Sequence, residues 1–305
     1  MTMQRNDVTI PSAGEQLAAW VYEPEHGEQR IPCVVMAHGF SATRRDGLPA
    51  YAERFAAAGF GVVLFDYRGF GESGGAPRQV ISIRRQQEDY AAAVAYARRQ
   101  AWIDPSQIAV FGSSFSGGHA VDTASRDSAI AAVVVQAPFA DGIAQLRITP
   151  PGTALRMTVD GLRDLWADAR GRPPVMIPVA GPPGSYAVLT AREAEPGFAS
   201  ILGEDSRWQN AVGARVMLFL GMWRPVRTAA KVACPMLVCI CDGDETTPPA
   251  PAERLGRNAP RGELVHYPIG HFDIYTGEHF EVAVADQVAF LQRVLKPVQA
   301  GAAAA

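Results

Sequence analysis

The 305-residue sequence predicts an α/β fold: a mostly parallel sheet of about eight strands, covered by helices on both faces, with an inserted cap. Short apolar runs alternate with helical patterns at both ends of the chain, as expected for strands that are buried on both faces of a parallel sheet. Between residues 139 and 227 this alternation stops, and clusters of proline and glycine replace it. We therefore expect residues 1–138 and 228–298 to form the core, residues 139–227 the cap, and residues 299–305 a disordered tail.

The composition is that of a globular protein. Hydrophobic residues make up 48% of the chain and charged residues 19%, which excludes an intrinsically disordered chain. The formal net charge is −3, so there is no electrostatic reason to expect nucleic acid or an anionic membrane as a partner. No run of about 18 apolar residues occurs, and the polar segment 1–7 lacks the apolar core of a signal peptide. We therefore expect a cytoplasmic protein.

The four cysteines are expected to be free thiols. Cys234, Cys239 and Cys241 lie in or beside one apolar run that is typical of a buried strand, and Cys33 lies in another. Cys239 and Cys241 are two residues apart on one strand, a spacing that rarely forms a disulfide, whereas buried thiols are common in a reducing cytoplasm. No second pair of cysteines has metal-ligand spacing, so we expect neither a metal nor a cofactor.

The first half of the chain alternates between strand and helix signals. Pro49 and Gly59 mark the start and the stop of one helix, and helical periodicity marks another over 82–99. The expected strands are 8–10, 17–22, 31–37, 61–65, 108–111 and 130–136. The expected helices are 49–58, 82–99 and 116–126.

The second half contains the cap and the end of the sheet. Several proline pairs interrupt the cap, and two helix-like pieces lie near them, over 155–169 and 209–220. The alternation then resumes, with strands expected over 235–240 and 262–267 and helices expected over 249–258 and 280–295.

The most informative segment joins a buried strand to a helix through residues 108–118. A serine on such a turn is held above the carboxyl edge of the sheet, and small residues are needed two before and two after it because helix and strand pass close together. Gly112 and Ser116 occupy these positions around Ser114, although glycine is usual at the second of them. Ser116 is the alternative nucleophile, but it would lie inside the helix, so Ser114 is predicted.

Acyl transfer also needs two N–H groups that point at the developing oxyanion. The residue after the nucleophile, Phe115, is expected to supply one of them at the helix N-terminus. The buried strand over 31–37 is followed by His38 and Gly39, and the glycine lets the backbone turn so that the N–H of Phe40 can supply the other. His38 precedes the serine in the chain, and we expect it to have a structural role.

A general base should follow the serine and the acid in chain order. His271 comes just after the last predicted strand, on a loop above the sheet, and is the predicted base. His266 lies inside that strand, His279 opens the last helix and His119 lies in the helix after the nucleophile, so these three are poorer candidates.

The acid should lie on the loop after the preceding strand, and Asp244 is the predicted residue. A buried carboxylate there would hold the imidazole in the right tautomer and stabilise the imidazolium. Asp242 is the alternative, but it stands only two residues beyond Ile240, where its side chain can cap local N–H groups.

Taken in chain order, these segments resemble the α/β-hydrolase superfamily. They are His38-Gly39-Phe40, the Asp66-Tyr67-Arg68-Gly69-Phe70-Gly71-Glu72-Ser73 loop, the Ser114 turn, Asp244 and Gly270-His271-Phe272. Within the superfamily, the chain is similar to bacterial hydrolases near the dienelactone-hydrolase and X-prolyl-peptidase-like groups. The resemblance implies an α/β-hydrolase fold, and it implies that the loop over 66–73 is structural.

The cap is where substrate contacts are expected. Trp166, Trp208 and Trp223 all fall within it, and they would line an apolar acyl pocket over Ser114. The alternative is that these aromatic side chains form only the core of the cap itself.

The sequence therefore predicts a serine hydrolase that cleaves a carboxylic ester or a related acyl bond through an acyl-enzyme intermediate. The same triad would serve an acyltransferase, thioesterase, lactonase, peptidase or carbon–carbon hydrolase, and these alternatives stay open. A non-catalytic ligand receptor on this fold would not need all three residues, and the histidines lack the spacing of a metallohydrolase. The expected partner is a small-molecule acyl substrate, and a homodimer stays open.

Overall fold

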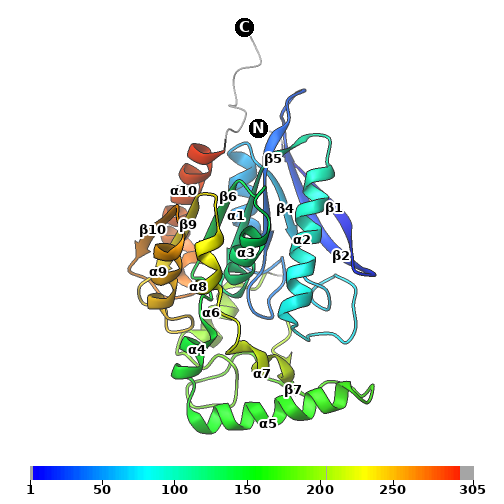
Figure 1. The fold of residues 1–305 in the computed structure, drawn as a ribbon, viewed down its shortest axis with the longest axis vertical. Helices are drawn as coiled ribbons and strands as arrows, with labels where there is room; N and C mark the ends of the chain where they lie inside the picture. Colours follow the sequence, from blue (N-terminus) through cyan, green and yellow to red (C-terminus); the bar gives the residue numbers. More distant parts are fainter. Residues whose placement is uncertain (1–2, 204, 296–305) are drawn as a thin grey trace.

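The computed structural model describes residues 3–203 and 205–295, and its centre is an eight-stranded sheet with the order β1-β2-β4-β3-β5-β6-β9-β10 (Figure 1). The strands are β1 (Met3–Ser12), β2 (Glu15–Pro24), β3 (Ile31–Ala37), β4 (Gly61–Phe65), β5 (Ile103–Ser113), β6 (Ala132–Gln136), β9 (Met236–Cys241) and β10 (Gly262–Tyr267). β2 runs antiparallel to β1 and β4, and the other neighbours are parallel. The predicted fold class is confirmed.

Helices cover both faces of the sheet, as Figure 1 shows. One face carries α1 (Pro49–Ala57) and α10 (Gly277–Val294). The other carries α2 (Ile83–Arg99), α3 (Phe115–Arg126), α8 (Pro225–Thr228) and α9 (Pro249–Asn258). Every residue of β3, β4 and β6 is buried, which explains why these strands read as continuous apolar runs in the sequence.

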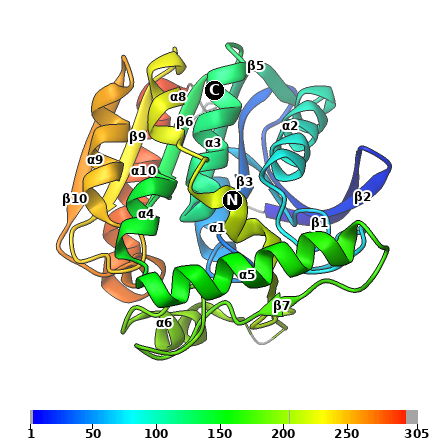
Figure 2. The same ribbon diagram turned by 60° about the horizontal axis from the view of Figure 1, so that its bottom comes forward.

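The chain between β6 and β9 contains the segment predicted to be a cap, which we call the insertion (residues 139–227). Its elements up to α8 are α4 (Gly142–Ile148), α5 (Pro151–Asp168), β7 (Met176–Ile177), α6 (Ala194–Ile201), β8 (Val212–Gly213), a 3-10 turn (Ala214–Val216) and α7 (Met217–Leu220). Figure 2 shows α5 lying across one end of the molecule, in front of the sheet and its covering helices. Two more 3-10 turns, Ala229–Lys231 and Asp273–Tyr275, lie outside the insertion.

The prediction of a helix over 209–220 is wrong. Only Met217–Leu220 is α-helical, because contacts with distant residues fix the backbone before it. The N–H of Gly213 donates to the carbonyl of Gln79 at 2.8 Å, and β8 pairs with β7. The carboxylate of Asp164 accepts the N–H of Arg215 at 2.8 Å and also binds its guanidinium. The tail predicted over 299–305 lies outside the described residues.

Candidate active site

Ser114 lies on the turn between β5 and α3, with a positive φ of 54°. A left-handed backbone is strained for serine, and such strain is typical of the turn that presents a nucleophile. A side chain at Gly112 would overlap the carbonyl of Ser116, so the strand and the helix can approach this closely only with glycine there. The Ser114 N–H donates to the carbonyl of Gln136 on β6 at 2.9 Å, which anchors the turn to the sheet.

Ser114, His271 and Asp244 form a continuous chain of hydrogen bonds. The Oγ of Ser114 lies 3.0 Å from Nε2 of His271, and Nδ1 of His271 lies 2.6 Å from Oδ2 of Asp244. With the proton on Nδ1, the imidazole donates to Asp244 and accepts from the Ser114 hydroxyl. The three residues are 8%, 2% and 7% exposed in the order serine, histidine, aspartate, so the chain is shielded from water.

The loop after β9 holds the Asp244 carboxylate in one orientation. Oδ1 accepts the backbone N–H groups of Thr246 at 2.8 Å and Thr247 at 2.6 Å, while Oδ2 accepts the hydroxyl of Thr247 at 2.7 Å. Such bonds to a charged acceptor are stronger than those between neutral groups. They leave Oδ2 directed at His271.

Two opposing effects set the pKa of His271. Burial lowers this pKa, while the charge and hydrogen bond of Asp244 and the charge of Glu193 raise it, and together they hold it above its ordinary value of 6.5. The site therefore favours a positively charged imidazole once a proton arrives, which is what a general base needs during proton transfer.

The alternative nucleophile and acid both face elsewhere. Ser116 is fully buried, and its hydroxyl is hydrogen-bonded to that of Tyr67 at 2.8 Å. The carboxylate of Asp242 lies at the surface, with 48% of its side chain exposed, and pairs with Nδ1 of His266 at 2.7 Å. Neither residue contacts His271 through a hydrogen bond within the part of the chain that the structure describes.

Among the histidines of the described residues, only His271 is hydrogen-bonded to Ser114 Oγ. The ring of His38 accepts the N–H of Tyr67 at 3.3 Å, and burial lowers the pKa of His38, so it is neutral and structural in its contacts. His119 is buried in α3, where its Nε2 lies 2.9 Å from Oε1 of Gln86. His279 is exposed near the start of α10.

Phe40 and Phe115, the predicted oxyanion donors, both border the space at Ser114. Phe115 is the first residue of α3, where N–H groups lack partners within the helix. The loop before Phe40 runs against the serine, since a Cβ added to Gly39 would lie 3.1 Å from Cβ of Ser114. The two rings contact each other edge to face, with centroids 5.2 Å apart.

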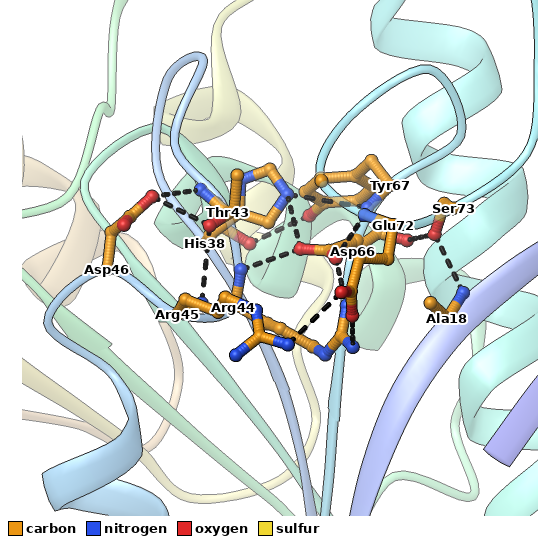
Figure 3. A network of polar contacts seen from close by, with 12 residues as sticks. Ala18, His38, Thr43, Arg44, Arg45, Asp46, Asp66, Tyr67, Glu72 and Ser73 are labelled. Carbon is orange, nitrogen blue, oxygen red and sulfur yellow. Dashed lines mark hydrogen bonds and ion pairs between the residues drawn. The ribbon is translucent and has the colours of Figure 1, made fainter. Parts of the chain in front are cut away.

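A buried ion-pair network fixes the loop that follows Phe40 (Figure 3). Asp66, just after β4, accepts the backbone N–H of Arg44 at 2.6 Å and that of Glu72 at 3.0 Å. The guanidinium of Arg44 pairs with the carboxylates of Asp66 and Glu72. Gly71 has a positive φ of 49°, and a side chain there would overlap the Asp66 carboxylate. These contacts hold the loop over 66–73 against the segment that follows Phe40.

Two small spaces adjoin Ser114. The first has a volume of about 30 Å³ and is bordered by Leu146, Met217 and Leu220 of the insertion, among others. The second has a volume of about 20 Å³ and extends toward Phe198 and His271. Each has room for one or two waters, so only a short acyl group would enter without movement of side chains.

The three tryptophans predicted to line the acyl pocket lie elsewhere, and none borders either space at Ser114 in the described chain. Trp166 lies on the outside of α5 and is 49% exposed. Trp208 stacks on Phe198, with ring centroids 4.9 Å apart. The indole N–H of Trp223 donates to the buried carboxylate of Asp122 at 2.7 Å, so Trp223 joins the insertion to α3. Packing accounts for all three better than substrate contact does.

Glu193 is a residue that the sequence motifs did not reveal. It immediately precedes α6 in the insertion, yet its carboxylate reaches the loops of both Asp244 and His271. A single carboxylate among many in an irregular segment carries no motif, and only the folded arrangement brings it to the site.

The remaining chemistry-bearing residues form no second centre within the described residues. The four cysteines are free, and Cys33, Cys239 and Cys241 are buried. No group of three or more His, Cys, Asp or Glu residues in the described ranges is arranged to hold a metal ion. None of the helices described is both long and apolar enough to cross a membrane.

Relatives of known name match most of the chain. The quorum-quenching protein AidA of Acinetobacter baumannii (strain MDR-ZJ06) is 40% identical over 289 residues, which cover 95% of each protein. The polyketide transferase ATR5 of Stachybotrys chlorohalonatus (strain IBT 40285) is 28% identical over 303 residues, covering 96% of this chain and 99% of that protein.

Fold and family comparisons agree with these matches. The crystal structure of the α/β hydrolase GrgF from Penicillium sp. sh18 superposes with a TM-score of 0.83 at 23% identity, covering 96% of this chain and 99% of that one. Residues 13–169 match the family model described as X-Pro dipeptidyl-peptidase (S15 family). The chain therefore belongs to this family of the α/β-hydrolase superfamily.

Proposed function

We propose that the protein is a serine hydrolase that cleaves a carboxylic ester or a related acyl bond. The observation that carries the proposal is the hydrogen-bonded chain from Ser114 through His271 to Asp244, which begins on a strained turn at the end of β5. A buried serine hydroxyl bonded to an oriented imidazole is the arrangement that activates a nucleophile.

The proposed reaction has two halves. Ser114 attacks the carbonyl carbon while His271 accepts its proton, and the N–H groups of Phe40 and Phe115 stabilise the oxyanion. His271 then gives that proton to the leaving group, which departs and leaves an acyl group on Ser114. In the second half, His271 removes a proton from water, the water attacks the acyl carbonyl, and the bond to Ser114 breaks with return of a proton to its oxygen.

A second candidate function is transfer of the acyl group to an acceptor other than water. The full-length similarity to a polyketide transferase favours this alternative. The two functions share the first half-reaction and differ only in the acceptor, so adding an alcohol or a thiol separates them. A fall in the free acid with a matching rise in a new ester or thioester would identify a transferase, whereas unchanged free acid supports hydrolysis.

A fluorophosphonate probe and the Ser114→Ala variant test the nucleophile. We expect the probe to label Ser114, as located by peptide mass spectrometry, and the variant to lose both labelling and turnover while its circular dichroism stays unchanged. The residual acceleration over water should be at most about 10³ to 10⁴-fold, since only binding and the oxyanion donors remain.

Ser116→Ala is the matched control, because Ser116 lies in the same turn with its hydroxyl bonded to Tyr67. It should keep labelling and turnover. An active Ser114→Ala enzyme beside an inactive Ser116→Ala enzyme would reverse the assignment. A panel of p-nitrophenyl esters, thioesters, lactones and Xaa-Pro anilides, assayed with the wild type, would define the scissile bond.

A further inference from the structure

The carboxylate of Glu193 bridges two loops that follow different strands of the sheet. Its Oε1 accepts the N–H of Glu245 at 2.9 Å, the N–H of Thr246 at 3.1 Å and the hydroxyl of Thr246 at 3.0 Å. Its Oε2 accepts the N–H of His271 at 2.8 Å. One oxygen therefore holds the loop of Asp244, and the other holds the loop of His271.

Glu193 differs from Asp141 and Asp164, two buried acidic side chains of the insertion, in the groups that stabilise its charge. Asp141 pairs with Arg224, and Asp164 pairs with Arg215, so each of these carboxylates is neutralised by an arginine. Glu193 has no arginine or lysine partner within residues 3–203 and 205–295. Its charge is therefore stabilised by donors on the two loops alone, three of them backbone N–H groups, and it remains available to act on the imidazole.

We propose that Glu193 is a positioning residue, which aligns the loops of Asp244 and His271 and couples both to the insertion. The inference rests on the proposed function, because it assigns the bridge a role in the reaction of Ser114. Glu193 thereby supports the base although it borders neither of the two spaces at Ser114. A backbone N–H can be held only by an acceptor, so no apolar contact would replace the bridge.

The bridge also has an electrostatic consequence. The acidic groups near the imidazole are Asp244 after β9, Glu193 before α6, and Asp273, whose Oδ2 accepts the N–H of Gly270. Burial lowers the pKa of His271, and the charges of Asp244 and Glu193 raise it. Because the imidazole gains a proton as Ser114 attacks, a charge that raises its pKa also stabilises the transition state.

Gly270 makes room for this arrangement. A Cβ added at Gly270 would overlap the Glu193 carboxylate and would lie 3.2 Å from Oδ2 of Asp273. Gly270 has no positive φ, so the space, and not the backbone conformation, requires glycine here. The atom that a methyl group would meet first is the end of a flexible side chain. In Gly270→Ala, the new methyl group should therefore push the Glu193 carboxylate out of its position, although Glu193 itself is not mutated.

The main experiment compares Glu193→Gln with Glu195→Gln, a matched change on the first turn of α6, where the side chain is exposed. The pKa of His271 is measured by NMR on protein with ¹³C-labelled histidine, and kcat/KM for an activated ester is measured from pH 5 to 9. Glu193→Gln should lower the pKa of His271 and move the acid limb of the profile to lower pH. Glu195→Gln should change neither.

The alkaline plateau provides the second readout. For each unit by which the His271 pKa falls, we expect the plateau kcat of Glu193→Gln to fall by up to about tenfold. The reason is that the same charge stabilises the imidazolium in the protonated resting enzyme and in the transition state. Gly270→Ala should change the pKa and the plateau in the same directions. If Glu193→Gln loses rate or thermal stability with an unchanged His271 pKa, its role is only structural and the proposal is overturned.

The two proposals fail in different ways. The His271 pKa is read in the resting protein, so it reports on Glu193 even in a protein that turns over no ester. An unlabelled Ser114 in the wild type would refute the proposed hydrolase. A labelled Ser114 together with a His271 pKa that is the same in wild type, Glu193→Gln and Gly270→Ala would refute the bridge alone.

Discussion

The carboxylate of Asp244 accepts hydrogen bonds from Thr246, Thr247 and His271, while Asp242, only two residues earlier, lies at the surface. The difference follows from how the loop leaves β9. The N–H of Asp242 still donates to the carbonyl of Tyr267 on β10 at 2.8 Å, so Asp242 continues the edge of the sheet. The chain turns inward only after Gly243, and Asp244 is the first carboxylate that reaches the imidazole.

This contrast defines a matched pair of variants. Asp244→Asn should lower kcat by about 10⁴-fold, as in the analogous change in other serine triads, because the amide favours the wrong imidazole tautomer. Asp242→Asn removes only a surface pair with His266, and we expect its kcat to stay within about twofold of the wild type. Steady-state kinetics with an activated ester, alongside circular dichroism, would check both. A fully active, folded Asp244→Asn enzyme would show that Asp244 does not orient the base.

The pH dependence of kcat/KM tests the base. His271 must be neutral to accept the proton of Ser114, so activity is lost as the pH falls through its pKa. Burial opposes the proton, but Asp244 and Glu193 outweigh it and raise that pKa above 6.5. The acid limb of the wild-type profile should therefore have its midpoint above pH 6.5. A midpoint below pH 6.5 would mean that burial lowers the His271 pKa by more than the two carboxylates raise it, or that another group titrates.

Among the helices and strands, those defined by local signals lie where the sequence predicts them. β3 and β4 occupy the apolar runs over 31–37 and 61–65, and α9 has the predicted bounds. β5 begins at Ile103, earlier than its apolar run, because Ile103 pairs with Ile31 across the sheet. A pairing between residues far apart in the chain leaves no local signal in the sequence. The short α7 and the bridge of Glu193 could not be predicted for the same reason, because long-range contacts fix both.

The two faces of α7 lead to a prediction about acyl-chain length. Met217 borders the space at Ser114, whereas Phe219 borders a separate cavity of about 950 Å³ whose lining shares no residue with that space. Met217→Ala should enlarge the space at Ser114 and raise the ratio of kcat/KM for butanoate over acetate esters by about tenfold, since each buried methylene contributes about 0.8 kcal/mol. Phe219→Ala should leave the ratio unchanged. An unchanged ratio in the Met217 variant would place the acyl group elsewhere.

On the scale of the whole molecule, the insertion and the sheet domain share one hydrophobic core. Buried side chains of the insertion, such as Met157, Phe198 and Leu220, belong to the same cluster as the strands of the sheet. Polar contacts reinforce this junction: the hydroxyl of Ser206 donates to Asp46 at 2.6 Å, and the indole N–H of Trp223 donates to Asp122 at 2.7 Å. The loss of strand and helix alternation over 139–227 predicted an insertion, but no sequence pattern could show how closely it packs against the sheet domain.

This shared core predicts a single unfolding transition. Exposure of the insertion alone would uncover apolar side chains of the shared core and would remove the indole N–H of Trp223 from the buried Asp122, so partial unfolding should cost nearly as much free energy as global unfolding. Three of the five tryptophans lie in the insertion, namely Trp166, Trp208 and Trp223, so their fluorescence reports mainly on it. Far-UV circular dichroism reports mainly on the sheet and its covering helices. In a guanidinium titration the two curves should coincide within error. A fluorescence transition at lower denaturant would show that the insertion opens by itself, and the alignment of His271 through Glu193 would then depend on that opening.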